Sequence, residues 1–174
     1  MKKLLFVLAA VILVFTRCGT MQSIIKSSFP YTATLVIPAS SSTGTTLTAI
    51  SQGTSFDQNF AKNGNNGAQV SDVHIVSAKM VATIPSDFNI GNLVSAKIYM
   101  AKANGEGEVL VASRTDIGAN SGNNITLDID NTHFLDELVR EKSVRIKMVY
   151  QLRNKISLDA SLRVVLGITA DPTK

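Results

Sequence analysis

The sequence predicts an all-β protein, an antiparallel β-sandwich of about seven or eight strands with one short α-helix. Apolar and polar side chains alternate with a period of two over most of the chain. Turn signals rich in Gly, Asn, Pro or Ser recur about every 8 to 15 residues. Only residues 132–142 carry apolar side chains at helical spacing. Alternation of this kind gives each strand one buried and one solvated face, which requires a two-layer core.

Each expected strand follows from its own alternation. Residues 94–114 predict a hairpin, because Asn104-Gly105 supplies the positive φ angles of a tight turn. The buried face of a strand at residues 73–84 is expected to hold Val76, Ala78, Met80, Ala82 and Ile84. The remaining strands are expected at residues 31–37, 45–50, 125–129, 144–153 and 158–168.

The last two of these strands show the clearest alternation and together predict a long antiparallel hairpin with one dry and one wet face. The dry face, which begins at Leu158 in the second strand, is expected to be buried against the opposite sheet. Its central members are Ile146, Met148, Leu162, Val164 and Leu166. A one-residue slip would turn the whole set toward solvent.

The wet face of the same hairpin carries four basic side chains, which form a possible interaction face: Arg145, Lys147, Arg153 and Arg163. Such a stripe could meet acidic lipid headgroups or an acidic partner. The alternative is that Lys and Arg on exposed strands only prevent aggregation between sheets. The interaction face requires the four residues to share the polar faces of the predicted hairpin.

One segment predicts a helix of about three turns, at residues 132–142. Its apolar residues at helical spacing are Phe134, Leu135, Leu138 and Val139. Asn131 or Thr132 can cap it, and the acidic residues Asp136 and Glu137 favour its first turns. We expect this helix to close one end of the sandwich and to link strands of opposite sheets.

The beginning of the chain has the composition of an export signal. Lys2 and Lys3 precede the uncharged residues 4–15, and Thr16-Arg17-Cys18 follow. The apolar run is shorter than the roughly 20 residues of a membrane-spanning helix, so residues 1–17 predict a secretory signal peptide.

The end of this segment resembles the lipobox of bacterial lipoprotein precursors, in which signal peptidase II cleaves before a cysteine that carries diacylglycerol. Phe15 stands where the family usually has Leu, and Cys18, the only cysteine, stands at the lipid attachment position. Arg17 departs from the pattern, which has a small residue before the cysteine. The alternative is an ordinary or uncleaved signal peptide with Cys18 incidental.

The resemblance implies that membrane lipid is attached through the acylated Cys18. Because Gly19 and not Asp follows the cysteine, it also implies the outer membrane. Residues 18–30 would then form a short lipidated tether, and residues 31–174 a single β-sandwich domain.

Composition excludes several classes of function. Of 17 basic and 13 acidic residues, Lys2, Lys3 and Arg17 leave with the signal, so 14 basic residues face 13 acidic ones. Without basic runs, nucleic acid is not an expected partner. A single cysteine allows no internal disulfide, so stability must come from apolar burial. The absence of Trp argues against a sugar-binding platform.

No motif predicts catalysis, a cofactor or a metal. The two histidines, His74 and His133, are expected on different elements and apart in space, and neither has the spacing of a metal ligand. Asp72 near His74 and Asp136 near His133 fit surface or capping contacts. We therefore expect no enzyme, and no catalytic, cofactor-binding or metal-binding residues.

Residues 124–170 contain a strand, a short helix with Leu-x-x-Leu/Val spacing and a long hairpin. This order is similar to late-embryogenesis-abundant (water-stress) type sandwiches and to many bacterial lipoproteins, and it implies a small sandwich without a particular function. The sequence favours a non-enzymatic envelope lipoprotein that contacts another envelope protein through a sheet edge or a loop face. The alternative is an accessory hydrolase or carbohydrate-binding lipoprotein with a site built from loops.

Overall fold

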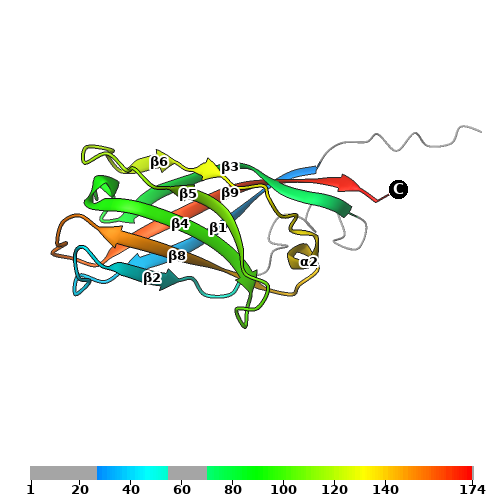
Figure 1. Ribbon diagram of the computed structural model, residues 1–174, viewed down its shortest axis with the longest axis horizontal. Helices are drawn as coiled ribbons and strands as arrows, with labels where there is room; N and C mark the ends of the chain where they lie inside the picture. The colour runs from blue at the N-terminus through cyan, green and yellow to red at the C-terminus, as the bar shows by residue number, and fades with distance from the viewer. Residues whose placement is uncertain (1–26, 55–69, 174) are drawn as a thin grey trace, which may run out of the picture.

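The computed structural model describes residues 27–54 and 70–173, and within them nine strands form two antiparallel sheets that pack face to face (Figure 1). The predicted all-β sandwich is confirmed. The strands are β1 (Ser27–Ile37), β2 (Thr46–Ile50), β3 (Val70–Ile84), β4 (Leu93–Lys102), β5 (Val109–Arg114), β6 (Asn124–Thr126), β7 (Asp128–Ile129), β8 (Val144–Leu152) and β9 (Ala160–Pro172). A 3-10 turn, η3 (Ile90–Asn92), precedes β4, and the short helix α2 (Asp136–Val139) precedes β8.

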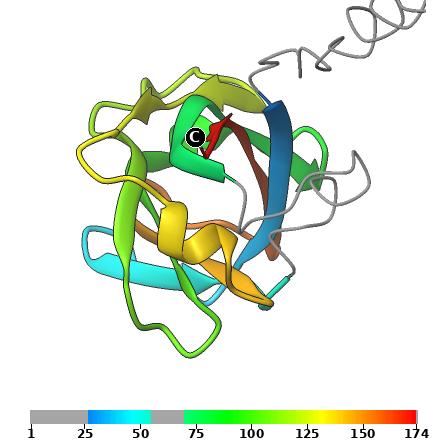
Figure 2. The ribbon, with the colours of Figure 1, turned by 90° about the vertical axis from the view of Figure 1, so that its right-hand side faces the viewer.

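The strand order is β1-β9-β3-β6 in the four-stranded sheet and β2-β8-β4-β5-β7 in the five-stranded sheet. The chain passes between the sheets at both lateral edges, from β1 to β2 and from β6 to β7. Figure 2 looks along the strands from the end that carries α2 and the C-terminus. The apolar core lies between the two layers.

The core confirms the faces expected for the last two strands. Burial in β8 alternates strictly along all nine residues. The five central residues of the predicted dry face, Ile146, Met148, Leu162, Val164 and Leu166, are each 0% exposed. Since each carries apolar area fully removed from water, these positions contribute strongly to stability.

The predicted terminal hairpin is wrong, because β8 and β9 belong to different sheets. β8 pairs with β2 and β4, whereas β9 lies between β1 and β3. The intervening residues 153–159 cross the roughly 10 Å between sheets. Leu158 lies in this connection and is 66% exposed, contrary to expectation, whereas Ile156 is buried. Alternation identifies the buried face of a strand but does not identify its partner.

The expected face of β3 is wrong at both ends because the strand contains irregularities. Its register against β9 shifts between Ser71 and His74, between Ile75 and Ser77, and between Ala82 and Ile84. A β-bulge inserts an extra residue and so changes which side chains point inward. Val76 and Ile84 are therefore exposed, and the buried residues are Val70, Val73, Ile75, Ala78, Met80 and Ala82.

The strand expected at residues 125–129 is divided between the two sheets. β6 pairs with β3, and β7 pairs with β5. Between them the buried Leu127 donates its N–H to the carbonyl of Ala78 over 2.9 Å. This segment therefore joins the two layers along one edge, and Leu127 fills the core beneath the crossing.

The predicted helix at residues 132–142 is much shorter in the structure, where α2 comprises only four residues, and it links β7 and β8 of the same sheet. Leu135 stands at its N-cap without a side-chain capping bond. Asn131 does not cap it. Its amide instead accepts from the Ile75 N–H over 3.2 Å and donates to the Ile75 carbonyl over 2.9 Å. These bonds to β3 thus hold the start of this segment outside the helix.

α2 nevertheless covers the end of the sandwich that is in front in Figure 2. Leu138 and Val139 are buried there. The expected position of the helix at one end is therefore confirmed, although its length and its connection are not.

The folded domain begins before the expected boundary at residue 31. β1 starts at Ser27, and Phe29 is buried. The signal peptide predicted at residues 1–17, Cys18 and most of the predicted tether lie outside the described residues. A lipidated tether would therefore comprise the nine residues 18–26, and not residues 18–30.

Burial of Tyr31 predicts a loss of stability in alkali. Its hydroxyl lies 2.7 Å from Thr54 Oγ1 and donates to the Val144 carbonyl over 3.2 Å. Desolvation raises the pKa of Tyr31 above 10.0, although the hydrogen bond with Thr54 opposes this shift. The unfolded chain therefore loses this proton first, and the free energy of unfolding should fall as pH rises above about 10. Tyr31→Phe should remove this part of the pH dependence.

Urea denaturation of both proteins at about pH 8 and about pH 11 measures this effect. Tyr31→Phe should be the less stable protein at the lower pH, since it loses two hydrogen bonds, by about 1–3 kcal/mol. The stability difference between the two proteins should shrink at the higher pH. An unchanged difference would show that the Tyr31 hydroxyl titrates alike in the folded and unfolded chains.

Candidate functional site

The four basic residues of the predicted interaction face do not share one surface. Arg145 and Lys147 lie on β8 in the five-stranded sheet, and Arg163 lies on β9 in the four-stranded sheet. Arg153 follows the end of β8. Since these sheets form opposite layers, their outer faces point in opposite directions.

Arg145 and Lys147 contact their own sheet. The Lys147 ammonium forms an ion pair with Glu108 and lies 4.9 Å from the centroid of the Tyr99 ring. The Arg145 guanidinium packs against the turn between β4 and β5, where a Cβ on Gly105 would stand 2.1 Å from Arg145 Nη2. Glycine is therefore favoured at position 105 by this close contact. It is also favoured by the backbone, because Gly105 has φ +96°. Lys147 thus holds the outer face of the five-stranded sheet together, whereas Arg145 makes only a packing contact there and its Nε is buried without a hydrogen-bond partner among the described residues.

Arg153 has a structural role that the sequence did not reveal. Its Nε donates to the Gly91 carbonyl over 3.1 Å, and its Nη2 donates to the Ile117 carbonyl over 2.6 Å. The guanidinium therefore joins the end of β8 to η3 and to the loop after β5. Charged donors make the stronger class of hydrogen bond, so this contact orders three segments at one end of the sandwich.

Unlike Lys147 and Arg153, Arg163 has no hydrogen-bond or ion-pair partner for its guanidinium in the described ranges. It is exposed between Thr34 of β1 and Val81 of β3. Lys79 is also exposed on this outer face, and it faces Val165 of β9. Diagonal neighbours on adjacent strands lie about 7–8 Å apart. Lys79 and Arg163 therefore form a pair of like charges on the four-stranded sheet.

The two histidines lie on different elements whose segments run side by side: His74 is in β3, and His133 is in the connection before α2. The Leu135 N–H donates to the Val73 carbonyl over 2.7 Å, so the segment with His133 runs beside the start of β3, which carries His74. His74 Nδ1 lies 2.6 Å from the Asp72 carbonyl oxygen. The pairing of residues 131–135 with β3 brings the segments together, and no spacing in the sequence indicates it.

His133 belongs to a short surface chain of hydrogen bonds. Its Nδ1 lies 2.9 Å from Thr132 Oγ1, and that hydroxyl donates to Asp130 Oδ1 over 2.6 Å. The hydroxyl bond from Thr132, followed by its backbone N–H, lowers the pKa of Asp130. The arrangement is exposed, and in the described part of the chain no group of three His, Cys, Asp or Glu residues could hold a metal.

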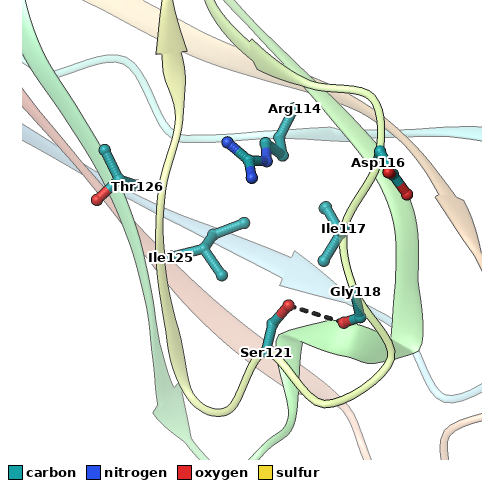
Figure 3. Close-up of a pocket in the computed structure, with 7 residues that line it drawn as sticks. All are labelled: Arg114, Asp116, Ile117, Gly118, Ser121, Ile125 and Thr126. Carbon is teal, nitrogen blue, oxygen red and sulfur yellow. Dashed lines mark hydrogen bonds between the residues drawn. The ribbon is translucent and has the colours of Figure 1, made fainter.

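A small pocket lies between the end of β5 and the start of β6 (Figure 3). Its volume is about 240 Å³, which is below the range of roughly 300–1,000 Å³ for sites that take drug-sized ligands. The side chains of Arg114, Ile117 and Ile125 point toward one another across it. The complete lining is Arg114, Asp116, Ile117, Gly118, Ser121, Ile125 and Thr126.

The loop beneath the pocket is held by Asn89. Its Oδ1 accepts from the N–H groups of Gly91 and Gly122 over 2.9 and 3.0 Å, and its Nδ2 donates to the Ala119 carbonyl over 2.7 Å. Gly91 approaches this loop so closely that a Cβ would stand 2.1 Å from the Ala119 oxygen. The sequence indicates a Gly-rich loop at residues 118–123, but not the distant residues that hold it.

The chemistry available in the pocket is limited to weak polar recognition. Arg114 Nη1 lies 3.4 Å from Asp128 Oδ1, and both side chains are largely exposed. Ser121 Oγ donates its proton to the Gly118 carbonyl over 2.7 Å, and not to a base that could activate the hydroxyl as a nucleophile. The pocket could accept a small group with an apolar body and a negative charge near Arg114.

Fold and surface together define a class of protein, a small antiparallel β-sandwich with a shallow pocket at one edge. No family model matches the sequence, and no curated protein shows significant similarity to it. Among the described residues, no helix is long and apolar enough to cross a membrane.

Proposed function

We propose that the protein is a non-enzymatic lipoprotein of the bacterial cell envelope, held at the outer membrane by lipid on Cys18, whose β-sandwich binds another envelope component. The observation that carries the proposal is the order of residues at positions 1–18. Two lysines precede an uncharged apolar run, and the only cysteine stands at its end. That position matches the lipid attachment point of the lipobox.

The distance between Cys18 and the domain supports this proposal. β1 begins nine residues after Cys18. A chain of nine residues reaches at most about 30 Å when fully extended. The sandwich would therefore stay next to the membrane, where it could meet only components at or near the same surface.

The outer face of the four-stranded sheet is the surface that we assign to the partner. Lys79 and Arg163 are exposed there, and they are surrounded by short side chains such as Thr34 and Val81. At the outward positions of residues 77–83 and 161–167 there is no acidic residue to neutralise them. This surface complements a partner with negative charge.

The distribution of titratable groups supports a binding role over catalysis. The pocket is lined by Arg114 and Asp116 and contains neither histidine. His74 and His133 lie on segments near α2, where their rings contact the Asp72 carbonyl and the Thr132 hydroxyl. A general base must accept the proton of the reacting group. The Thr132 hydroxyl beside His133 instead donates its proton to Asp130, and His74 Nδ1 contacts a backbone oxygen.

Cys18→Ala should abolish lipid attachment and release the protein from the membrane. Two acyl chains on the glycerol and one on the freed amine exceed the marginal anchoring that a single chain provides. Metabolic labelling with a fatty acid analogue, followed by membrane fractionation in high salt, measures both effects. Ser23→Ala, a change in the predicted tether, should leave labelling unchanged.

A second variant tests the departure from the lipobox. Arg17→Ala restores a small residue before the cysteine and should increase the fraction of processed protein. If the wild type incorporates no label, the proposed anchor is wrong.

A further inference from the structure

The end of the sandwich that carries α2 is where the chain from Cys18 enters the fold. Ser27 pairs with Ala170, and Val70 pairs with Pro172, so the starts of β1 and β3 and the end of β9 lie together. Figure 1 shows α2 at the same end. If Cys18 is acylated, this end of the domain is tethered within about 30 Å of the bilayer.

Phe134 is exposed at this end. The residue is 62% exposed, which makes it the most exposed Phe or Tyr in the part of the chain that the structure describes. The ring of His74 contacts it edge to face, with centroids 6.4 Å apart and an interplanar angle of 73°. A single exposed aromatic residue is not unusual. Phe134 matters here because it lies at the end of the domain that the proposed lipid anchor would hold near the bilayer.

The backbone on both sides of Phe134 is fixed to β3. On one side, the Asn131 side chain makes two hydrogen bonds to the backbone of Ile75. On the other side, Leu135 is buried, and its N–H donates to the Val73 carbonyl. The ring therefore projects from a well-anchored segment, so little conformational entropy would be lost when it makes a contact.

Charges around Phe134 indicate which kind of surface it meets. Asp136 and Glu137 follow it in α2, and Arg140, Glu141 and Lys142 come next. Since both signs are present, strong attraction to an anionic membrane is not expected. An aromatic ring among mixed charges suits the headgroup region of a zwitterionic phospholipid bilayer.

We infer that the α2 end of the sandwich rests on the bilayer that holds the lipid of Cys18, and that Phe134 inserts into its headgroup region. This inference depends on the proposed lipid anchor. One ring buries too little apolar area for stable binding by itself. A short tether, however, gives an effective concentration in the millimolar range, which makes a weak contact sufficient.

The absence of Trp from the chain allows a direct test. Phe134→Trp introduces a single indole fluorophore at the proposed contact. Leu158→Trp is the matched control, because Leu158 is 66% exposed and precedes the start of β9, at the opposite end of the sandwich. Both positions are on the surface, so both variants should fold, which circular dichroism checks.

Each variant, as the acylated full-length protein, is reconstituted into phosphatidylcholine vesicles with brominated acyl chains, and attachment is measured by flotation. The indole fluorescence of the Phe134→Trp variant should shift to shorter wavelength and be quenched at least twofold relative to vesicles without bromine, whereas that of the Leu158→Trp variant should not. Flotation with equal quenching of both variants, or of neither, would overturn the inference while leaving the anchor intact. Failure to float would overturn the proposed anchor and the inference with it.

Discussion

Leu162→Ala is expected to lower the free energy of unfolding by about 2–5 kcal/mol. Leu162 is 0% exposed in β9, the strand with β1 on one side and β3 on the other. Its neighbours in register, Leu35 and Ala82, are also buried. Truncation removes apolar contacts and leaves a cavity that two flanking strands prevent from collapsing.

Arg163→Ala is the matched control, one residue further along the same strand. Its side chain is exposed, so removal should change the free energy of unfolding by no more than about 0.5 kcal/mol. Equilibrium urea denaturation measures both variants. Equal destabilisation would show that the faces of β9 are assigned wrongly.

Gly91→Ala is expected to cost about 1–3 kcal/mol, because the new methyl group would meet backbone atoms. Its Cβ would stand 2.1 Å from the Ala119 oxygen and 2.6 Å from the Gly118 oxygen. The loop cannot withdraw without breaking the bonds that Asn89 makes to Gly122 and Ala119. Hydrogen exchange at residues 117–122 should therefore accelerate together with the loss of stability.

Gly118→Ala tests whether this effect is specific to Gly91. Within the same loop, a Cβ on Gly118 would have Ser121 Oγ as its nearest neighbour, at 3.6 Å, which is an ordinary contact. The change should alter stability by less than about 1 kcal/mol, in either direction. If both variants were equally stable, the close approach at Gly91 would not constrain the fold.

The basic residues show that the face a residue occupies on its own strand does not predict which other residues share its surface. Arg145, Lys147 and Arg163 do alternate with buried neighbours, so each points outward as expected. Whether they meet depends on the sheet to which each strand belongs, and β8 and β9 join different sheets. The outward direction of each side chain was predictable, but the relation of the three residues to one another was not.

The pocket, and the pairing of the His133 segment with β3, could not be predicted from the sequence for a related reason. Asn89 and Arg153 hold the loop of residues 117–122 from positions far away in the chain. Asn131 and Leu135 attach to β3 across more than fifty residues. Such contacts depend on long-range geometry, and a single sequence contains no periodic signal for them.

Local periodicity by itself determined the all-β class, the buried faces of β8 and of most of β9, and the positions of most strands. A period of two reflects only the burial of alternate side chains, which each strand records independently. Tertiary structure decided the strand partners, the division of residues 124–129 at Leu127, the bulges in β3 and the short length of α2. These features depend on backbone hydrogen bonds and packing between distant segments, so they become defined only when the two sheets meet.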